Sequence, residues 1–231
     1  SIHTGSIDAH LTGKTSGYTL VNWFDLFTSS LSRQNVWVPL RNTLLLAIFT
    51  CFGSILYGGV FAYLVTRTNL KCKKYLSSIF IFPYIMPQWT LAVVWKNLFY
   101  SNAVTGGSDG LLASIFNIRM PAWWCKGLFP SSVVLALHYA PFAYIMIGSI
   151  FRNMDANLEE AAVILNTPKR RIFSRITLPM VKPAILSTIL LVFGSAMGSY
   201  PVPHYLNLTT LSTKYVSMNV NRAGEASILA I

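Results

Sequence analysis

Four long runs without a charged residue limit what this chain can fold into. They contain no Asp, Glu, Lys or Arg, and they extend over 42–66, 75–95, 127–151 and 183–213. A helix needs about 20 predominantly apolar residues to cross a bilayer, so each run is long enough to do so. Because hydrophobic residues make up 53% of the sequence and charged residues only 11%, the composition also excludes an ordinary soluble domain. We therefore predict an all-α transmembrane fold.

The predicted spans cover about 42–66, 75–99, 128–151 and 183–200. The fourth run is longer than one span, and we expect Pro201 and Pro203 to end its helix. A last apolar segment at 226–231 is too short to cross a membrane. We interpret it as the truncated start of a fifth span.

The segment before the first predicted span is polar with interspersed aromatic residues. Trp23, Phe24, Phe27 and Trp37 suit a helix that lies at the membrane interface. A small soluble cap is an equal alternative. We expect 1–41 to be an external or interfacial segment, followed by a transmembrane domain over 42–231.

The formal charge of +11 fits either a nucleic-acid partner or an oriented membrane protein. If the first span begins outside, ten of the eighteen basic residues fall in two short cytoplasmic segments. These ten are Arg67, Lys71, Lys73, Lys74, Arg152, Lys169, Arg170, Arg171, Arg175 and Lys182. The others are spread over longer external stretches, so the positive-inside rule favours this orientation. We therefore expect contact with membrane lipid and no nucleic-acid partner.

Polar and helix-breaking residues inside the spans are the candidates for a translocation pathway. An ionisable residue within a span, here His138, is a functional candidate by default. A proline in a span frees the backbone carbonyl one turn earlier, and such breaks often line a cavity. The candidate pathway residues are Pro83, Pro87, His138, Pro141, Tyr144, Ser195, Gly198 and Tyr200. The alternative is that the prolines are kinks and that the neutral histidine is simply buried.

Small residues recur four apart in two of the spans. Ser54, Gly58 and Ala62 do so in the first, and Gly194 and Gly198 do so in the fourth. Such spacing lets membrane helices approach closely. We expect close helix packing at both places.

Motifs for catalysis or metal binding do not appear in the sequence. The four histidines lack metal-ligand spacing, and there is neither a Gly-x-Ser-x-Gly elbow nor a His-Glu-x-x-His motif. We therefore expect a non-catalytic chain without metal or cofactor. A membrane-embedded enzyme and a passive channel are the alternative classes.

A charged loop at 155–179 separates the third and fourth predicted spans. Asp155 is a plausible N-cap, and Glu159 and Glu160 lie near the positive end of the helix dipole. Leu158, Ala161, Ala162 and Leu165 recur at helical spacing and form a narrow apolar stripe. The small side chains in this stripe would let another surface approach closely.

A second short helix is expected after the first one in this loop. Asn166 suits the end of the first helix, and Pro168 suits the first turn of the next. The basic residues of this second helix are expected to point outward, and Ile172, Phe173 and Ile176 inward. The periodicity alone also fits an amphipathic surface loop whose basic residues face lipid head groups.

The complete spacing resembles the EAA loop of ABC-transporter permease subunits. The matching residues are Glu160, Ala161, Ala162, Asn166, Phe173, Ile176, Leu178 and Pro179. Asn166 replaces the usual Gly of that family, which is a mild departure because Asn tolerates the left-handed conformation. The resemblance implies that Glu159, Glu160, Ala161, Ala162, Asn166, Pro168, Phe173, Ile176, Leu178 and Pro179 couple the chain to an ATPase.

The resemblance also implies the assembly in which such a chain works. It implies a multi-pass permease in the bacterial plasma membrane, a second permease subunit or fused half, a cytoplasmic ABC ATPase dimer, and an external substrate-binding protein. Residues 191–226 are similar to iron(III)-type permeases, which implies ferric iron or a chelate as the substrate. Relatives of that group carry polyamines, thiamine, phosphonates or sulfate, and these remain alternatives.

Overall fold

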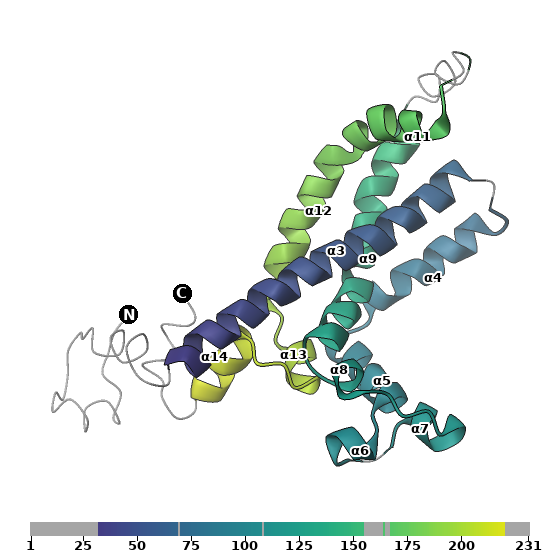
Figure 1. Ribbon diagram of the computed structural model, residues 1–231. Coiled ribbons are helices and arrows are strands. Elements are labelled where there is room, and N and C mark those ends of the chain that lie inside the picture. The colour runs from purple at the N-terminus through teal and green to yellow at the C-terminus, as the bar shows by residue number, and fades with distance from the viewer. Residues whose placement is uncertain (1–31, 69, 108, 155–163, 165–166, 220–231) are drawn as a thin grey trace, which may run out of the picture. The chain divides into compact units, whose positions relative to one another are not determined.

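The computed structural model describes residues 32–68, 70–107, 109–154, 164 and 167–219. All regular structure within these residues is helical (Figure 1). By contacts between their backbones, the residues divide into two compact units. Unit 1 contains the described residues of 1–46, 92–131 and 196–231, and unit 2 contains those of 47–91 and 132–195.

The three longest helices are α3 (Val38–Arg67), α9 (Leu128–Asn153) and α12 (Leu178–Gly198). Short helical segments precede two of them. The π-helix η1 (Arg33–Trp37) leads into α3, and α11 (Lys169–Ile172) with the π-helix η2 (Phe173–Thr177) leads into α12. In the described part of the chain, three helical stretches are long and apolar enough to cross a membrane: 33–67, 122–153 and 170–198.

The segment predicted to be one span at 75–99 consists of two helices. They are α4 (Lys73–Ile85) and α5 (Gln88–Phe99), and they are bent by 98° at the break between them. Met86 in the break is extended, with ψ at 141°. This follows from the sequence, because the ring of Pro87 disfavours a helical conformation in the preceding residue. Pro83, in contrast, lies inside α4.

The core of unit 2 lies where α3 meets α9 and α12. Ala62 of α3, Ala140, Ala143 and Ile147 of α9, and Val181 of α12 are all buried there. Small residues on the facing sides of α3 and α9 allow this close contact. The prediction of close packing in the first span is confirmed at Gly58, where a Cβ atom would lie 2.3 Å from the carbonyl oxygen of Ala140.

The same expectation is wrong for Gly194 and Gly198 within the described part of the chain. A Cβ atom built on either glycine has no neighbour within 4 Å. Spacing alone therefore did not distinguish a packed glycine from an open one. The difference is whether another helix of the chain packs against the glycine, and the local sequence does not determine that.

The contrast between these glycines gives a direct test of the packing. Gly58→Ala is expected to destabilise the folded chain by about 1–3 kcal/mol, because the new methyl group overlaps backbone atoms of α9. Gly194→Ala is the matched control, since it adds the same methyl group to a helix where there is open space. Thermal unfolding of the two variants in the same detergent measures the difference. Equal melting temperatures would contradict the packing described for α3 and α9.

Unit 1 is built mainly from short helices and the ends of longer ones. The short helices are α6 (Asn102–Thr105), α7 (Leu111–Phe116), α8 (Ala122–Cys125), α13 (Pro201–Tyr205) and α14 (Leu211–Asn219). Backbone groups connect distant segments: the amide of Gly127 donates to the carbonyl of Leu206 at 2.8 Å. The Trp95 indole likewise donates to the carbonyl of Trp124 at 3.1 Å. These bonds hold the segments around 95–127 and 200–207 together.

Candidate translocation and coupling sites

A buried polar cluster lies in unit 2 where α9 meets the bend after α4. The Nδ1 atom of His138 lies 3.0 Å from the carbonyl oxygen of Pro83. A carbonyl can only accept, so His138 donates through Nδ1. This carbonyl is the one that the residue at position 87 would bond in a continuous helix, and Pro87 has no N–H to offer. His138 therefore satisfies the backbone group that the proline frees.

Two tyrosines of α9 continue this cluster through side-chain hydrogen bonds. The Gln88 amide donates to the Tyr139 hydroxyl at 2.7 Å, and Ser195 also interacts with that hydroxyl. One turn further, the Tyr144 hydroxyl donates to Ser77 Oγ of α4 at 2.9 Å. These contacts tie α9 to α4 and to the start of α5. Gln88, Ser77 and Tyr139 were not singled out from the sequence, because nothing in their spacing marks them.

The candidate pathway residues do not share one environment. His138, Pro141 and Tyr144 are buried within unit 2. The others reach the surface of the chain to differing degrees: Pro83, Ser195 and Tyr200 are partly exposed, and Pro87 and Gly198 are exposed. Tyr84, beside them on α4, is exposed and lies 5.5 Å from the ring of His138. Tyr84 is exposed at the surface of the chain, whereas His138 and Tyr144 are hydrogen-bonded inside unit 2.

The candidate coupling loop is only partly described by the structure. Glu159, Glu160, Ala161, Ala162 and Asn166 lie outside the described residues, as does Asp155. Pro168 precedes α11, which is followed without a break by η2 and α12. Phe173 and Ile176 lie in η2, and Leu178 and Pro179 begin α12.

The side chains at the start of this helical stretch differ in part from the sequence prediction. Ile172 is buried, as expected, but Phe173 remains 46% exposed instead of pointing inward. Its ring packs edge-on against Tyr63 of α3 at 6.1 Å. The amphipathic pattern predicted a buried Phe173 because it assumes a core on the apolar side of the helix. In the structure that side faces the surface of α3, which covers the ring only in part.

The two segments predicted to be cytoplasmic meet at the same end of unit 2. Arg67, at the end of α3, lies over the ring of Phe151 near the end of α9, 6.0 Å from its centre. Tyr63 contacts both Phe151 and Phe173. Tyr63 near the end of α3 therefore packs against Phe151 near the end of α9 and against Phe173 of η2, which brings the basic segments at these ends to one end of unit 2.

Cysteine labelling tests this orientation. Cys72 is exposed in the segment between α3 and α4, so a membrane-impermeant thiol reagent is expected to reach it only after spheroplasts are lysed. Cys125, in the segment predicted to be external, is buried and is unsuitable as the counterpart. Arg119→Cys supplies an exposed external thiol that should react in intact spheroplasts. Labelling of Cys72 before lysis would overturn the orientation.

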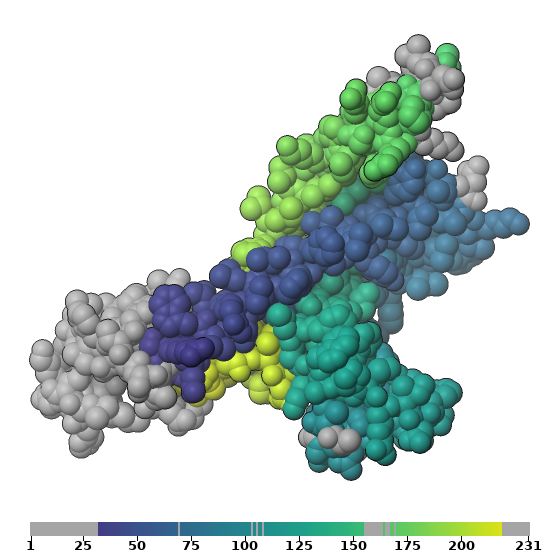
Figure 2. Space-filling model, in the orientation of Figure 1, coloured from purple at the N-terminus to yellow at the C-terminus, as the bar shows by residue number. Residues whose placement is uncertain are grey.

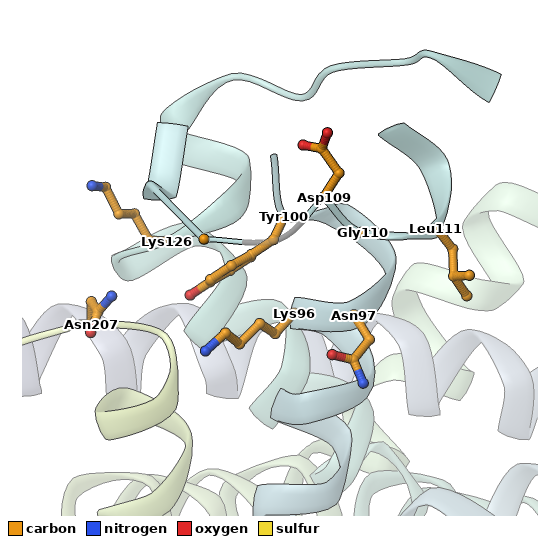
Figure 3. Close-up of a pocket in the computed structure, with 9 residues that line it drawn as sticks. Lys96, Asn97, Tyr100, Asp109, Gly110, Leu111, Lys126 and Asn207 are labelled. Atoms are coloured by element: carbon orange, nitrogen blue, oxygen red, sulfur yellow. The ribbon is translucent and has the colours of Figure 1, made fainter. Parts of the chain in front are cut away.

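A polar pocket of about 540 Å³ lies in unit 1 on the predicted external side (Figure 3). Its lining comprises Lys96, Asn97, Tyr100, Gly107, Asp109, Gly110, Leu111, Lys126 and Asn207. No pattern in the sequence indicated a pocket here. The pocket forms because the amide of Gly110 donates to the carbonyl of Tyr100 at 2.8 Å, which brings the loop back over the end of α5.

The chemistry of this pocket is that of a cationic, hydrogen-bonding surface. Lys96 Nζ lies 5.2 Å from the centre of the Tyr100 ring, and Figure 3 shows both side chains on the side of the pocket near Asn207. Burial, and secondarily the nearby Cys125, raises the pKa of the Tyr100 phenol, so it is a neutral donor at physiological pH. Asp109 accepts a hydrogen bond from the amide of Asn102 at 2.6 Å.

Comparison with protein families gives a match over residues 44–224 to the family of binding-protein-dependent transport system inner membrane components. Over 195 residues the chain is 24% identical to the Fe(3+)-transport system permease protein FbpB 2 of Haemophilus influenzae, covering 83% of this chain and 34% of that protein. Over 175 residues it is 29% identical to the molybdate/tungstate transport system permease protein WtpB of Pyrococcus abyssi, covering 76% and 62%. The chain thus spans less than two thirds of the length of either relative.

Among solved structures, the chain is similar to a bacterial ABC transporter involved in the import of the acidic polysaccharide alginate. The TM-score is 0.70 at 18% sequence identity, over 97% of this chain and 81% of the other. At this identity the similarity concerns the fold alone. Together with the apolar helices, it confirms the predicted all-α transmembrane fold of the importer-permease type.

Proposed function

The chain belongs to the family of binding-protein-dependent transport system inner membrane components, and on that premise we propose that it is a permease subunit of a bacterial ABC importer. It forms part of the substrate pathway across the plasma membrane. It is a transport subunit and not an enzyme, because ATP is hydrolysed by a separate cytoplasmic partner. The loop 155–179 couples the chain to that partner.

The observation that carries the coupling role is the helical continuity from the second half of this loop into α12. Residues 170–198 form one helical stretch, in which α11 and η2 lead into the membrane helix α12. A displacement of the loop can therefore be passed along an unbroken helix into α12, although Pro183 lies within that helix. Closure of the ATPase dimer would move this stretch and change which side of the membrane the pathway faces.

The partners follow from the same proposal. A second permease subunit or fused half completes the pathway, and an external binding protein delivers the substrate. The external pocket around Lys96 and Tyr100 is the described surface best suited to contact that protein, because it offers cationic and hydrogen-bonding groups.

We propose ferric iron, as the ion or a small chelate, as the substrate. The similarity to an iron permease supports iron, and the similarity to a molybdate/tungstate permease makes an oxyanion the main alternative. The exposed or partly exposed hydroxyls of Tyr84, Ser195 and Tyr200 would let a hydrated or chelated ion pass without holding it tightly. Specificity then resides in the binding protein.

Uptake by cells with and without the permease tests both the importer function and the assignment of iron as the substrate. Deletion is expected to abolish uptake of labelled ferric iron while uptake of molybdate, sulfate and spermidine continues. If another of these solutes is lost instead, the iron assignment is wrong and the importer function stands. If deletion leaves uptake unchanged for every solute that binding-protein-dependent importers carry, the importer function is contradicted as well.

A further inference from the structure

An apolar groove of about 640 Å³ opens on the surface of unit 2 between α3 and the η2–α12 stretch (Figure 2). Ile147 and Phe151 of α9 contribute to its lining. Gly59 adds depth, since a Cβ atom there would come within 3.3 Å of Ile147. The groove is distinct from the polar cluster around His138, but its Arg170, Phe173, Thr177 and Leu178 also belong to the proposed coupling loop 155–179.

The groove has the length of one membrane leaflet. The two helices that border it run antiparallel, because Tyr63 contacts Phe173 at one end and Cys51 Sγ lies 3.7 Å from the Ile189 carbonyl beyond the other. On α3 the lining extends from Ile55 to Leu64. At 1.5 Å per residue this is about 14 Å, close to half of a hydrocarbon core about 30 Å thick.

Charge is concentrated at one end of this groove only. Arg170 is the single charged residue in the lining, and it lies in the turn before Phe173. Arg171 and Arg175 are exposed next to it. This is the end predicted to lie at the cytoplasmic surface. The only carboxylate among the described residues is Asp109, which belongs to unit 1.

We infer that this groove binds a membrane phospholipid with an anionic head group. The acyl chain lies against Leu56, Val60 and the other apolar residues of the lining, and the phosphate is placed at Arg170. Basic residues at the cytoplasmic ends of membrane helices attract anionic head groups, and the tail gains contact with a shaped surface. The inference depends on the orientation of the chain and not on its substrate or on ATP coupling.

A second copy of this chain is a poorer occupant. Two copies in one membrane have the same orientation, so a symmetric contact through this groove would bring the two Arg170 residues and their basic neighbours together at the same depth. Like charges would oppose that contact, whereas an anionic lipid neutralises them.

Native mass spectrometry of the purified full chain tests the site. The chain is incubated in detergent with equal amounts of phosphatidylglycerol and phosphatidylcholine that carry the same acyl chains. We expect one retained lipid, with phosphatidylglycerol preferred at least about fivefold. Arg170→Gln should reduce that preference about fivefold. Leu56→Trp should abolish retention of both lipids, because the indole fills the groove.

Two control variants match these changes outside the groove. Arg119→Gln removes an exposed charge from the predicted external segment, and Ile48→Trp adds an indole to an exposed position on α3. Both should retain lipid like the unmodified chain. The site would be contradicted if Arg170→Gln kept the full preference for phosphatidylglycerol, or if Leu56→Trp retained lipid as well as the unmodified chain. A photo-crosslinker at Val60 that joins two chains instead of labelling lipid would also overturn it.

Discussion

Replacing Ala161 or Ala162 with Trp is expected to lower substrate uptake more than tenfold and to prevent co-purification of the ATPase. Both alanines belong to the small-residue stripe of the loop, where a partner surface must approach closely. An indole at this stripe excludes that surface sterically. Uptake by whole cells and co-purification in detergent measure the two effects.

Glu160→Lys should give the same defect in milder form. It places a positive charge near the positive end of the predicted helix, which costs about 0.3–1 kcal/mol, or up to about fivefold in affinity. Ile118→Trp is the matched control, because it adds the same bulk at an exposed position in the predicted external segment. If assembly and uptake are undiminished in all three loop variants, the loop does not dock the ATPase.

The sequence predicted the fold class well because the relevant signal is strong and local. Long uncharged runs are sufficient to indicate membrane helices. The 98° break between α4 and α5 was not predicted, although Pro87 marks its position. A proline signals a possible break, but the angle depends on whether a neighbour satisfies the freed carbonyl, and that neighbour, His138, is more than 50 residues away in sequence.

The candidate sites were less predictable for the same reason. Tyr144 and His138 are polar residues of the kind expected along a pathway. Both are nevertheless buried and hydrogen-bonded inside unit 2. Conversely, the groove bordered by Phe173 consists of ordinary apolar residues that any membrane helix would carry. Which apolar face is covered is decided by tertiary packing, and no local pattern records it.

His138→Ala is expected to destabilise the chain strongly and thereby reduce uptake. The change removes the donor to the Pro83 carbonyl and leaves a cavity beside Tyr84. A buried acceptor without a partner costs about 1–3 kcal/mol, and the cavity adds to that cost. In the membrane interior no bulk water replaces the lost donor. Thermal unfolding in detergent and uptake in cells measure the two consequences.

The variant His138→Asn distinguishes a structural role from contact with the substrate. The amide nitrogen of Asn can donate to the Pro83 carbonyl from nearly the position of His138 Nδ1, so it should recover much of the lost stability. His204→Ala serves as the control, since His204 is exposed and stacks on Tyr200 at 5.0 Å. If His138→Ala is as stable as the control, the bond to Pro83 does not support the bend. If His138→Asn is stable but inactive in uptake, His138 acts on the substrate in addition to holding the break between α4 and α5.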